Sequence, residues 1–110
     1  MDYLVRIFKS VANETRVRLL EVLLESKEET LESLAKVLKL PYKTVSRNLN
    51  ILEKAMLVRS RRWRGKVYYS AETSPRLIYG REILKLIKKR KSRKEKPVSP
   101  VSRFLEKARK

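Results

Sequence analysis

Hydrophobic residues recur at the helical spacing of three and four positions along the first half of the chain. Two such stretches predict helices over about residues 3–10 and 14–26. Asn13 can cap the second helix by accepting a backbone N–H, and Glu14 then faces the positive end of the helix dipole. The residues that form the two apolar faces are Leu4, Ile7, Phe8, Val11, Val17, Leu20 and Leu24.

Two further predicted helices follow within a short distance of each other. Thr30 can cap the first, and Pro41 fits the first position of the second, where its missing N–H would be unpaired anyway. The second helix, about residues 41–54, turns Val45, Leu49 and Leu52 inward. Its free face is polar and consists of Lys43, Ser46, Arg47 and Asn50. Two helices joined by about three residues, the second polar on its free side, predict a helix-turn-helix.

The next stretch predicts a strongly basic β-hairpin over about residues 58–70. Segments 58–62 and 66–71 are rich in β-forming residues, and Gly65 supplies the positive φ that a tight turn often needs. Ten residues hold five cations and no acid: Arg59, Arg61, Arg62, Arg64 and Lys66. Folding requires no such charge, so we expect contact with phosphate or the minor groove. Trp63 is expected to fold back onto the sheet rather than project as a wedge.

A last helix is predicted from Ser74 as cap and Pro75 as first residue. Its apolar residues lie on more than one stripe, which gives it two surfaces to bury. One is the core, and the other is expected to be a second copy of the chain. We therefore expect residues 1–91 to form one mainly α domain with a small β-hairpin, in the order four helices, two strands, one helix. Residues 92–110 are expected to form a flexible basic tail.

Charge is distributed very unevenly. The formal net charge is +17, yet residues 1–32 hold five basic and seven acidic side chains, and the other 78 residues hold 24 and five. Such asymmetry favours a polyanionic partner for the second half of the chain. A solubility surface would tend to mix both signs, and an anionic membrane surface is a weaker alternative.

The chain contains no cysteine and no histidine. Disulfides, thiolate switches and zinc fingers are therefore excluded, and we expect no metal and no cofactor. Two glycines and no phosphate-cradling loop leave no credible active site, so we expect no enzyme. No secretory signal or membrane-length apolar run is present, which predicts a soluble cytoplasmic protein associated with the nucleoid.

Three blocks of sequence, in order, resemble the ArsR-like winged helix-turn-helix transcription regulators. Residues 8–20, FKSVANETRVRLL, are similar to the family's F-K-A-L-A-D-P-T-R-x-R-I-L. Residues 44–49, TVSRNL, are similar to T-V-S-R-H-L, and residues 57–59 and 65–69 resemble the strands that flank the wing. The resemblance covers roughly residues 8–87. It lacks the family's metal-binding cysteines and histidines, and Lys39 and Pro41 stand where the family has Gly and Ser.

The resemblance implies a homodimer whose paired recognition helices enter successive major grooves of a pseudo-palindromic operator. It assigns DNA contact to the second helix of the helix-turn-helix, and the wing role to residues 61–66. With the polar face found above, the expected DNA-binding residues are Tyr42, Lys43, Thr44, Ser46, Arg47, Asn50, Arg61, Arg62, Arg64 and Lys66. The first and last helices would form the dimer interface through Leu4, Phe8, Ile83, Leu86 and Ile87.

These observations together predict a homodimeric regulator, in particular a repressor, that binds double-stranded DNA and occludes a promoter. One alternative is an architectural protein that coats DNA with the same fold but without sequence choice, which the basic tail would also suit. Another is a winged helix that binds RNA or protein. The ratio of specific to non-specific DNA binding separates the first alternative from a regulator.

Overall fold

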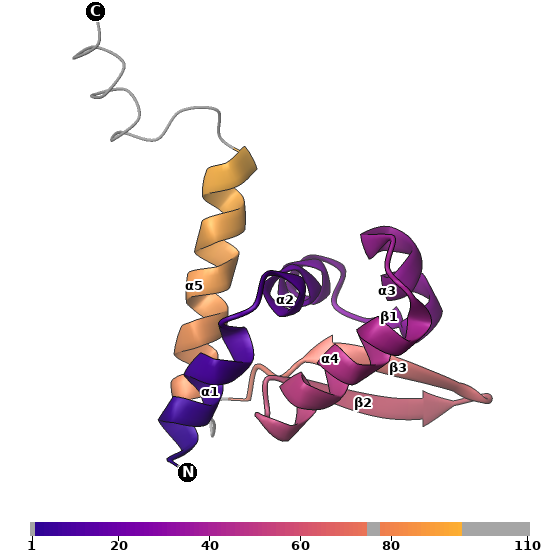
Figure 1. The fold of residues 1–110 in the computed structure, drawn as a ribbon, viewed down its shortest axis with the longest axis horizontal. Coiled ribbons are helices and arrows are strands. Elements are labelled where there is room, and N and C mark those ends of the chain that lie inside the picture. Colours follow the sequence, from indigo (N-terminus) through magenta and orange to yellow (C-terminus); the bar gives the residue numbers. More distant parts are fainter. Residues whose placement is uncertain (1, 75–77, 96–110) are drawn as a thin grey trace, which may run out of the picture.

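The computed structural model describes residues 2–74 and 78–95 (Figure 1). The first and last helices lie side by side at one end of the molecule, and the β-hairpin extends at the other end beneath the two helices of the helix-turn-helix. The elements in chain order are α1 (Tyr3–Val11), α2 (Glu14–Ser26), β1 (Glu29–Thr30), α3 (Leu31–Leu38), α4 (Tyr42–Lys54), β2 (Val58–Trp63), β3 (Lys66–Ala71) and α5 (Ile78–Glu95). In the described part of the chain, no helix is both long enough and apolar enough to cross a bilayer.

The helix starts predicted for α2 and α3 are confirmed by their caps. Asn13 Oδ1 accepts the backbone N–H of Arg16 at 3.1 Å, and Thr30 Oγ1 accepts that of Ser33 at 3.1 Å. Each bond satisfies a donor that the first helical turn leaves unpaired. The sequence therefore fixes both helix starts locally.

The sheet has three antiparallel strands in the order β1-β3-β2, rather than the two predicted. The hairpin pairs Val58 with Ala71 and Trp63 with Lys66, while Glu29 and Thr30 of β1 pair with Tyr69 and Tyr68. The prediction missed β1 because a two-residue strand of Glu and Thr shows no alternation of apolar and polar positions. The element order is thus two helices, a strand, two helices, two strands and a helix.

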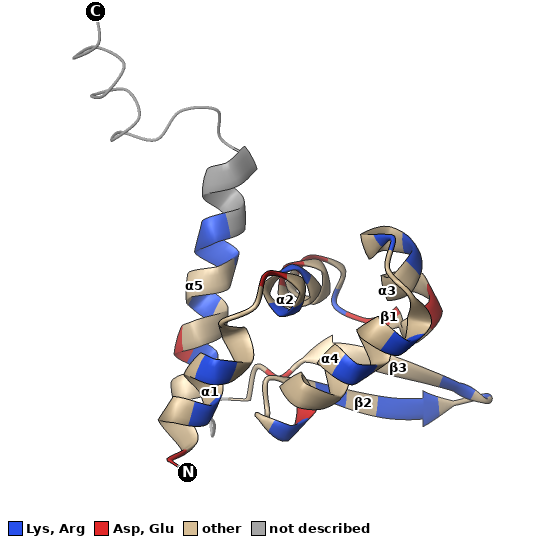
Figure 2. Cartoon of the chain, viewed as in Figure 1, with Lys and Arg blue, Asp and Glu red and all other residues tan. Residues whose placement is uncertain are grey.

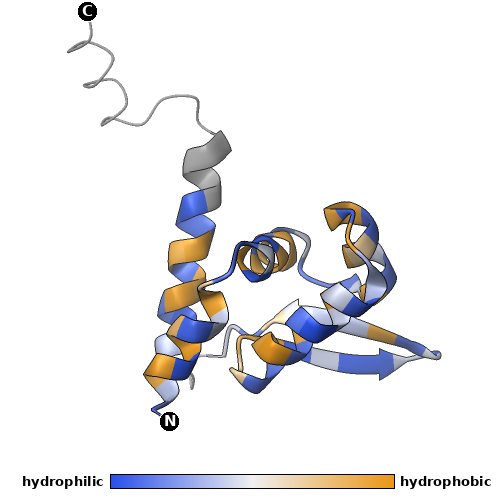
Figure 3. Cartoon of the chain, viewed as in Figure 1, coloured by the Kyte–Doolittle hydropathy of each residue, from blue (hydrophilic) through white to orange (hydrophobic). Residues whose placement is uncertain are grey.

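One hydrophobic core joins the helices to the base of the hairpin. Leu20 of α2, Leu34 of α3 and Leu49 of α4 have no exposed surface, whereas Val17 and Leu24 on the predicted apolar face of α2 are half-buried. α5 contributes Ile83, Leu84 and Ile87 to the same core. Hydrophobic positions also appear on the visible sides of α1 and α5, which lie beside each other at one end of the molecule (Figure 3).

α5 is held against α2 by ion pairs as well as by apolar packing. The Arg90 guanidinium donates to Glu21 at 2.6 Å and to Glu14 at 3.0 Å. The predicted start of this helix at Ser74 and Pro75 borders residues 75–77, which lie outside the described residues. α5 continues to Glu95, past residue 92, where the tail is predicted to begin. Residues 96–110 lie outside the described part.

Candidate nucleic-acid interface

The turn between α3 and α4 sets the position of the candidate reading helix. Lys39 takes a left-handed conformation with φ 55°, and its N–H closes the end of α3. Pro41 has extended ψ 146° and precedes the helix, so its predicted place at the first helical position is wrong by one residue. No side chain caps α4. The first turn of α4 therefore keeps backbone N–H groups without a side-chain acceptor.

α4 presents the polar face that its sequence predicts. Val45, Leu49 and Leu52 are fully buried, and this fixes the rotation of the helix about its axis. The opposite face carries the exposed residues Lys43, Ser46, Arg47 and Asn50, and Thr44 is half-buried. Basic residues mark the visible side of α4 and the hairpin beside it (Figure 2). This face offers guanidinium, ammonium, hydroxyl and amide groups, which can read base edges and hold phosphates.

Tyr42 is oriented toward α3 rather than freely outward. Its hydroxyl donates to Glu32 Oε1 at 2.6 Å, although 48% of the residue is exposed. This hydrogen bond raises the pKa of Tyr42 and lowers the pKa of Glu32. Contact between this hydroxyl and a DNA phosphate would first require the bond to Glu32 to open.

Two consecutive residues with positive φ form the tip of the hairpin. Arg64 has φ 50° and Gly65 has φ 77°, the combination that two-residue hairpin turns favour. The Arg64 guanidinium lies 4.4 Å from the centre of the Trp63 ring. All five wing cations are exposed.

The two central arginines of β2 lie on opposite faces of the hairpin. Side chains alternate along a strand, so Arg62 shares a face with Ser60, whose hydroxyl donates to Glu53 of α4 at 2.7 Å. Arg61 lies on the other face and makes two 2.7 Å hydrogen bonds to Glu28. This pairing lowers the pKa of Glu28. Arg62 is therefore on the α4 side, whereas the charge of Arg61 is already compensated.

Trp63 packs only partly against the sheet. Its ring meets Tyr68 edge to face, with the ring centres 6.5 Å apart, and half of the residue stays exposed. The Arg61 guanidinium lies 4.9 Å from the centre of the same Tyr68 ring. The expected fold-back is thus only partial, and the exposed part of the indole remains available at the wing tip.

An internal hydrogen-bond network that the sequence analysis missed holds α4 to α1 and α2. Arg16 of α2 donates to the Ser10 carbonyl at 2.5 Å and to Asn48 Oδ1 at 2.8 Å, and Asn48 donates to the Thr44 carbonyl at 2.8 Å. Asn48 is nearly buried. Its position between Val45 and Leu49, on the inward side of α4, was the available signal. The network fixes the helix that carries the polar face.

Comparisons with known proteins agree with this geometry. The family model described as a helix-turn-helix domain matches residues 11–61. Comparison with curated protein sequences gives no match. Among solved structures, the transcriptional regulator HlyU from Vibrio vulnificus is similar at 29% identity and a TM-score of 0.62, over 76% of this chain and 81% of that one.

Two further structures extend the likeness. The transcriptional repressor PagR of Bacillus anthracis has 25% identity and a TM-score of 0.63, over 76% of this chain and 90% of its own. Mb0332 from Mycobacterium bovis, described as a homodimeric winged helix-turn-helix DNA-binding domain and a possible ArsR-family regulator, has 24% identity and a TM-score of 0.67. That match covers 89% of this chain and 83% of the other. The chain has a winged helix-turn-helix fold and is similar to these transcription regulators, one of which is described as a possible ArsR-family member.

These likenesses agree with the sequence resemblance and with the expectation of a transcription regulator. The five residues expected at a dimer interface occupy different environments in the structure. Ile83 and Ile87 are only 8% and 6% exposed because they pack in the protomer's own core. Leu4 is half-buried, whereas Phe8 and Leu86 are 53% and 61% exposed. Phe8 and Leu86 therefore offer the most surface to a partner.

Proposed function

We propose that this regulator binds double-stranded DNA as a homodimer, with α4 in the major groove and the β2–β3 hairpin on the backbone or in the minor groove. The observation that carries the proposal is the exposed polar face of α4 beside the cationic hairpin. Ser60 and Glu53 join the two elements, and Arg62 lies on the hairpin face turned to α4. A duplex lying along this surface would meet base-reading and phosphate-binding groups together.

Within this interface we assign different tasks to different residues. Arg47 is central on the exposed face of α4 and is suited to bidentate contact with guanine. Lys43, Arg62, Arg64 and Lys66 would neutralise phosphates. Arg61 would contribute less than these, because Glu28 compensates its charge. If about six cations meet phosphates, log K should fall against log salt with a slope of about −5.

The homodimer is supported by apolar surface on two adjacent helices. Tyr3 of α1 and Tyr79 of α5 have ring centres 6.2 Å apart, so these helices form one surface. Val5, Phe8, Tyr79 and Leu86 on these helices are large hydrophobic residues that remain exposed. Burial of such a patch against a second copy would remove it from water and pair the two α4 helices.

Repression would follow from occlusion, because a dimer over a promoter excludes polymerase by its volume. Such a protein would act at the chromosome, in the cytoplasm. Footprinting on genomic fragments tests the proposal, with discrete protected sites as the expected result. Uniform coverage would favour the architectural alternative, and preference for folded RNA over duplex DNA would favour the RNA-binding one.

Variants sharpen this test. Arg47→Ala should weaken discrimination at one base position by about 1–3 kcal/mol. Arg62→Ala should weaken binding to all sequences and reduce the salt slope by about 1 per contact. Arg18→Ala is the matched control. Arg18 is exposed and lies two residues, about 200° around α2, from the inward-facing Arg16.

A further inference from the structure

A basic cleft lies between α1 and the C-terminal half of α4, outside the interface assigned above. Its volume is about 490 Å³. Tyr3 joins α1 to the end of α4, because its hydroxyl donates to the carbonyl of Ala55, the residue after α4, at 3.3 Å. The lining residues are Arg6, Lys9, Ser10, Arg16, Ile51 and Lys54. Four of these six are cations and none is an acid.

The charges around this cleft are not compensated within the described part of the chain. Arg61 and Arg90 pair with carboxylates, but the described residues provide no ion pair to Arg6, Lys9, Arg16 or Lys54. Arg16 is held by neutral acceptors, the Ser10 carbonyl and the Asn48 amide oxygen. A half-buried cation with neutral partners favours an anion nearby.

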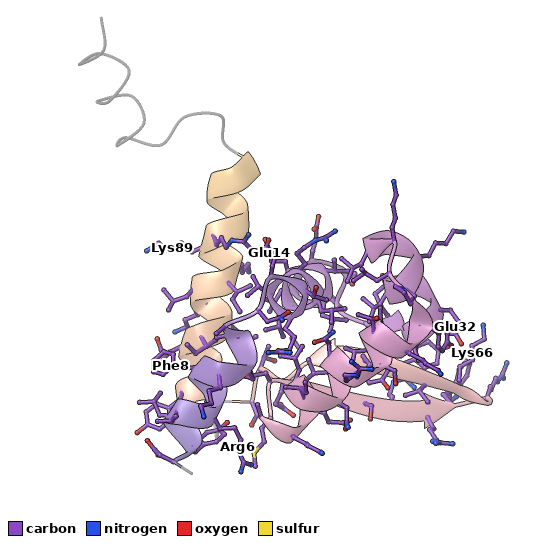
Figure 4. All side chains as sticks on the ribbon, in the orientation of Figure 1. Arg6, Phe8, Glu14, Glu32, Lys66 and Lys89 are labelled. Carbon is purple, nitrogen blue, oxygen red and sulfur yellow. The ribbon has the colours of Figure 1, made fainter. Side chains whose placement is uncertain are left out.

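The cleft continues the polar face of α4 rather than forming a separate surface. Lys54 is eleven residues after Lys43, so the two side chains differ by only about 20° around the helix axis. Arg47 and Asn50 lie between them on the same stripe. Figure 4 shows Arg6 on the edge of α1 nearest the end of α4, and Phe8 on the opposite side of α1. The cleft thus lies between the polar face of α4 and the apolar surface of α1.

We propose that this cleft binds a phosphate of the DNA backbone in the segment between the two half-sites. The proposal rests on the proposed function, because it places the cleft between α4 and the dimer axis. Arg6, Lys9 and Lys54 would supply the cationic contacts, and Arg16 would add fixed positive charge. Ile51 offers an apolar contact for the adjoining sugar. The footprint would then extend inward from each major groove toward the centre of the operator.

The test compares two double variants with the same loss of charge. Arg6→Gln/Lys9→Gln alters the cleft, and Arg18→Gln/Lys27→Gln alters exposed cations elsewhere. Binding of the full chain to its selected operator is measured by fluorescence anisotropy across a salt series. One phosphate lost in each of two clefts should reduce the salt slope of the first variant by about 1.8 relative to the control variant. Circular dichroism verifies that both variants are folded.

Phosphate ethylation locates the contact. With the wild-type chain, ethylation of the central phosphates should interfere with binding, and the cleft variant should lose this sensitivity. Equal slopes for the two double variants, or no central interference, would overturn the proposal while leaving operator binding intact. Failure of the wild-type chain to prefer any operator would instead overturn the proposed function.

A small phosphorylated ligand could bind the same cations of the cleft in place of the DNA backbone. Inorganic phosphate, titrated at constant ionic strength, should displace DNA from the wild-type chain and the cleft variant equally. Selective release of DNA from the wild-type chain by phosphate would assign the cleft to a small phosphorylated ligand and overturn the backbone assignment.

Discussion

Asn48→Ala should destabilise the protein measurably, because Asn48 is buried and hydrogen-bonded on the inward side of α4. The substitution removes the acceptor of the 2.8 Å bond from Arg16 and the 2.8 Å bond to the Thr44 carbonyl. A hydrogen bond to a charged group contributes about 1.5–3 kcal/mol, and a neutral one about 0.5–1.5 kcal/mol. The better helix propensity of Ala returns about 0.6 kcal/mol. The expected net loss is about 2 kcal/mol.

Urea unfolding at fixed protein concentration measures this loss. With a slope of about 2 kcal/mol/M, the midpoint should fall by about 1 M while the slope stays constant. A double-mutant cycle with Arg16→Met should give a coupling energy of about 1–2 kcal/mol between the two residues. Operator affinity should also fall, with an unchanged salt slope, because α4 loses its anchor but no phosphate contact disappears.

Asn48→Asp is the matched control, because it keeps an acceptor for Arg16 and should retain most of the stability. A loss below about 0.5 kcal/mol for Asn48→Ala would refute the reasoning, since ordinary surface substitutions cause changes of that size. A coupling energy near zero would show that Arg16 and Asn48 act independently.

Three further predictions concern the wing and the dimer. Glu28→Gln should lower the stability at neutral pH, because only the carboxylate pairs with Arg61. The difference in stability from the wild type should vanish as the pH falls through the lowered pKa of Glu28. The variant should also free Arg61 and steepen the salt slope of DNA binding, and an unchanged slope would contradict this. Arg64→Asn should raise the urea midpoint, since Asn tolerates positive φ better, yet weaken DNA binding, and a gain in affinity would show that Arg64 contacts no DNA. Leu86→Glu should shift the monomer–dimer equilibrium toward monomer without unfolding the chain, as measured by sedimentation equilibrium. An unaltered molecular mass would place the interface elsewhere.

Local sequence chemistry was sufficient for most of the fold. Asn13 and Thr30 cap their helices through bonds that span three residues, and the apolar periodicity of α4 sets which side faces outward. Gly65 and the β-forming residues beside it likewise specify a hairpin. These interactions join residues close in sequence, so a pattern in one segment is enough to predict them.

Only the tertiary structure decided which of the expected site residues remain available. Arg61 and Arg62 are neighbours in a uniformly basic segment, yet Glu28, 33 residues away, compensates one and leaves the other beside α4. Tyr42 depends in the same way on Glu32, and the cleft of Arg6, Lys9 and Lys54 exists because α1 packs beside α4. Composition gives the number of charges in a segment, and periodicity gives the face of the helix or strand on which they lie. The partners of those charges come from other elements, and chain folding alone brings them within hydrogen-bonding distance.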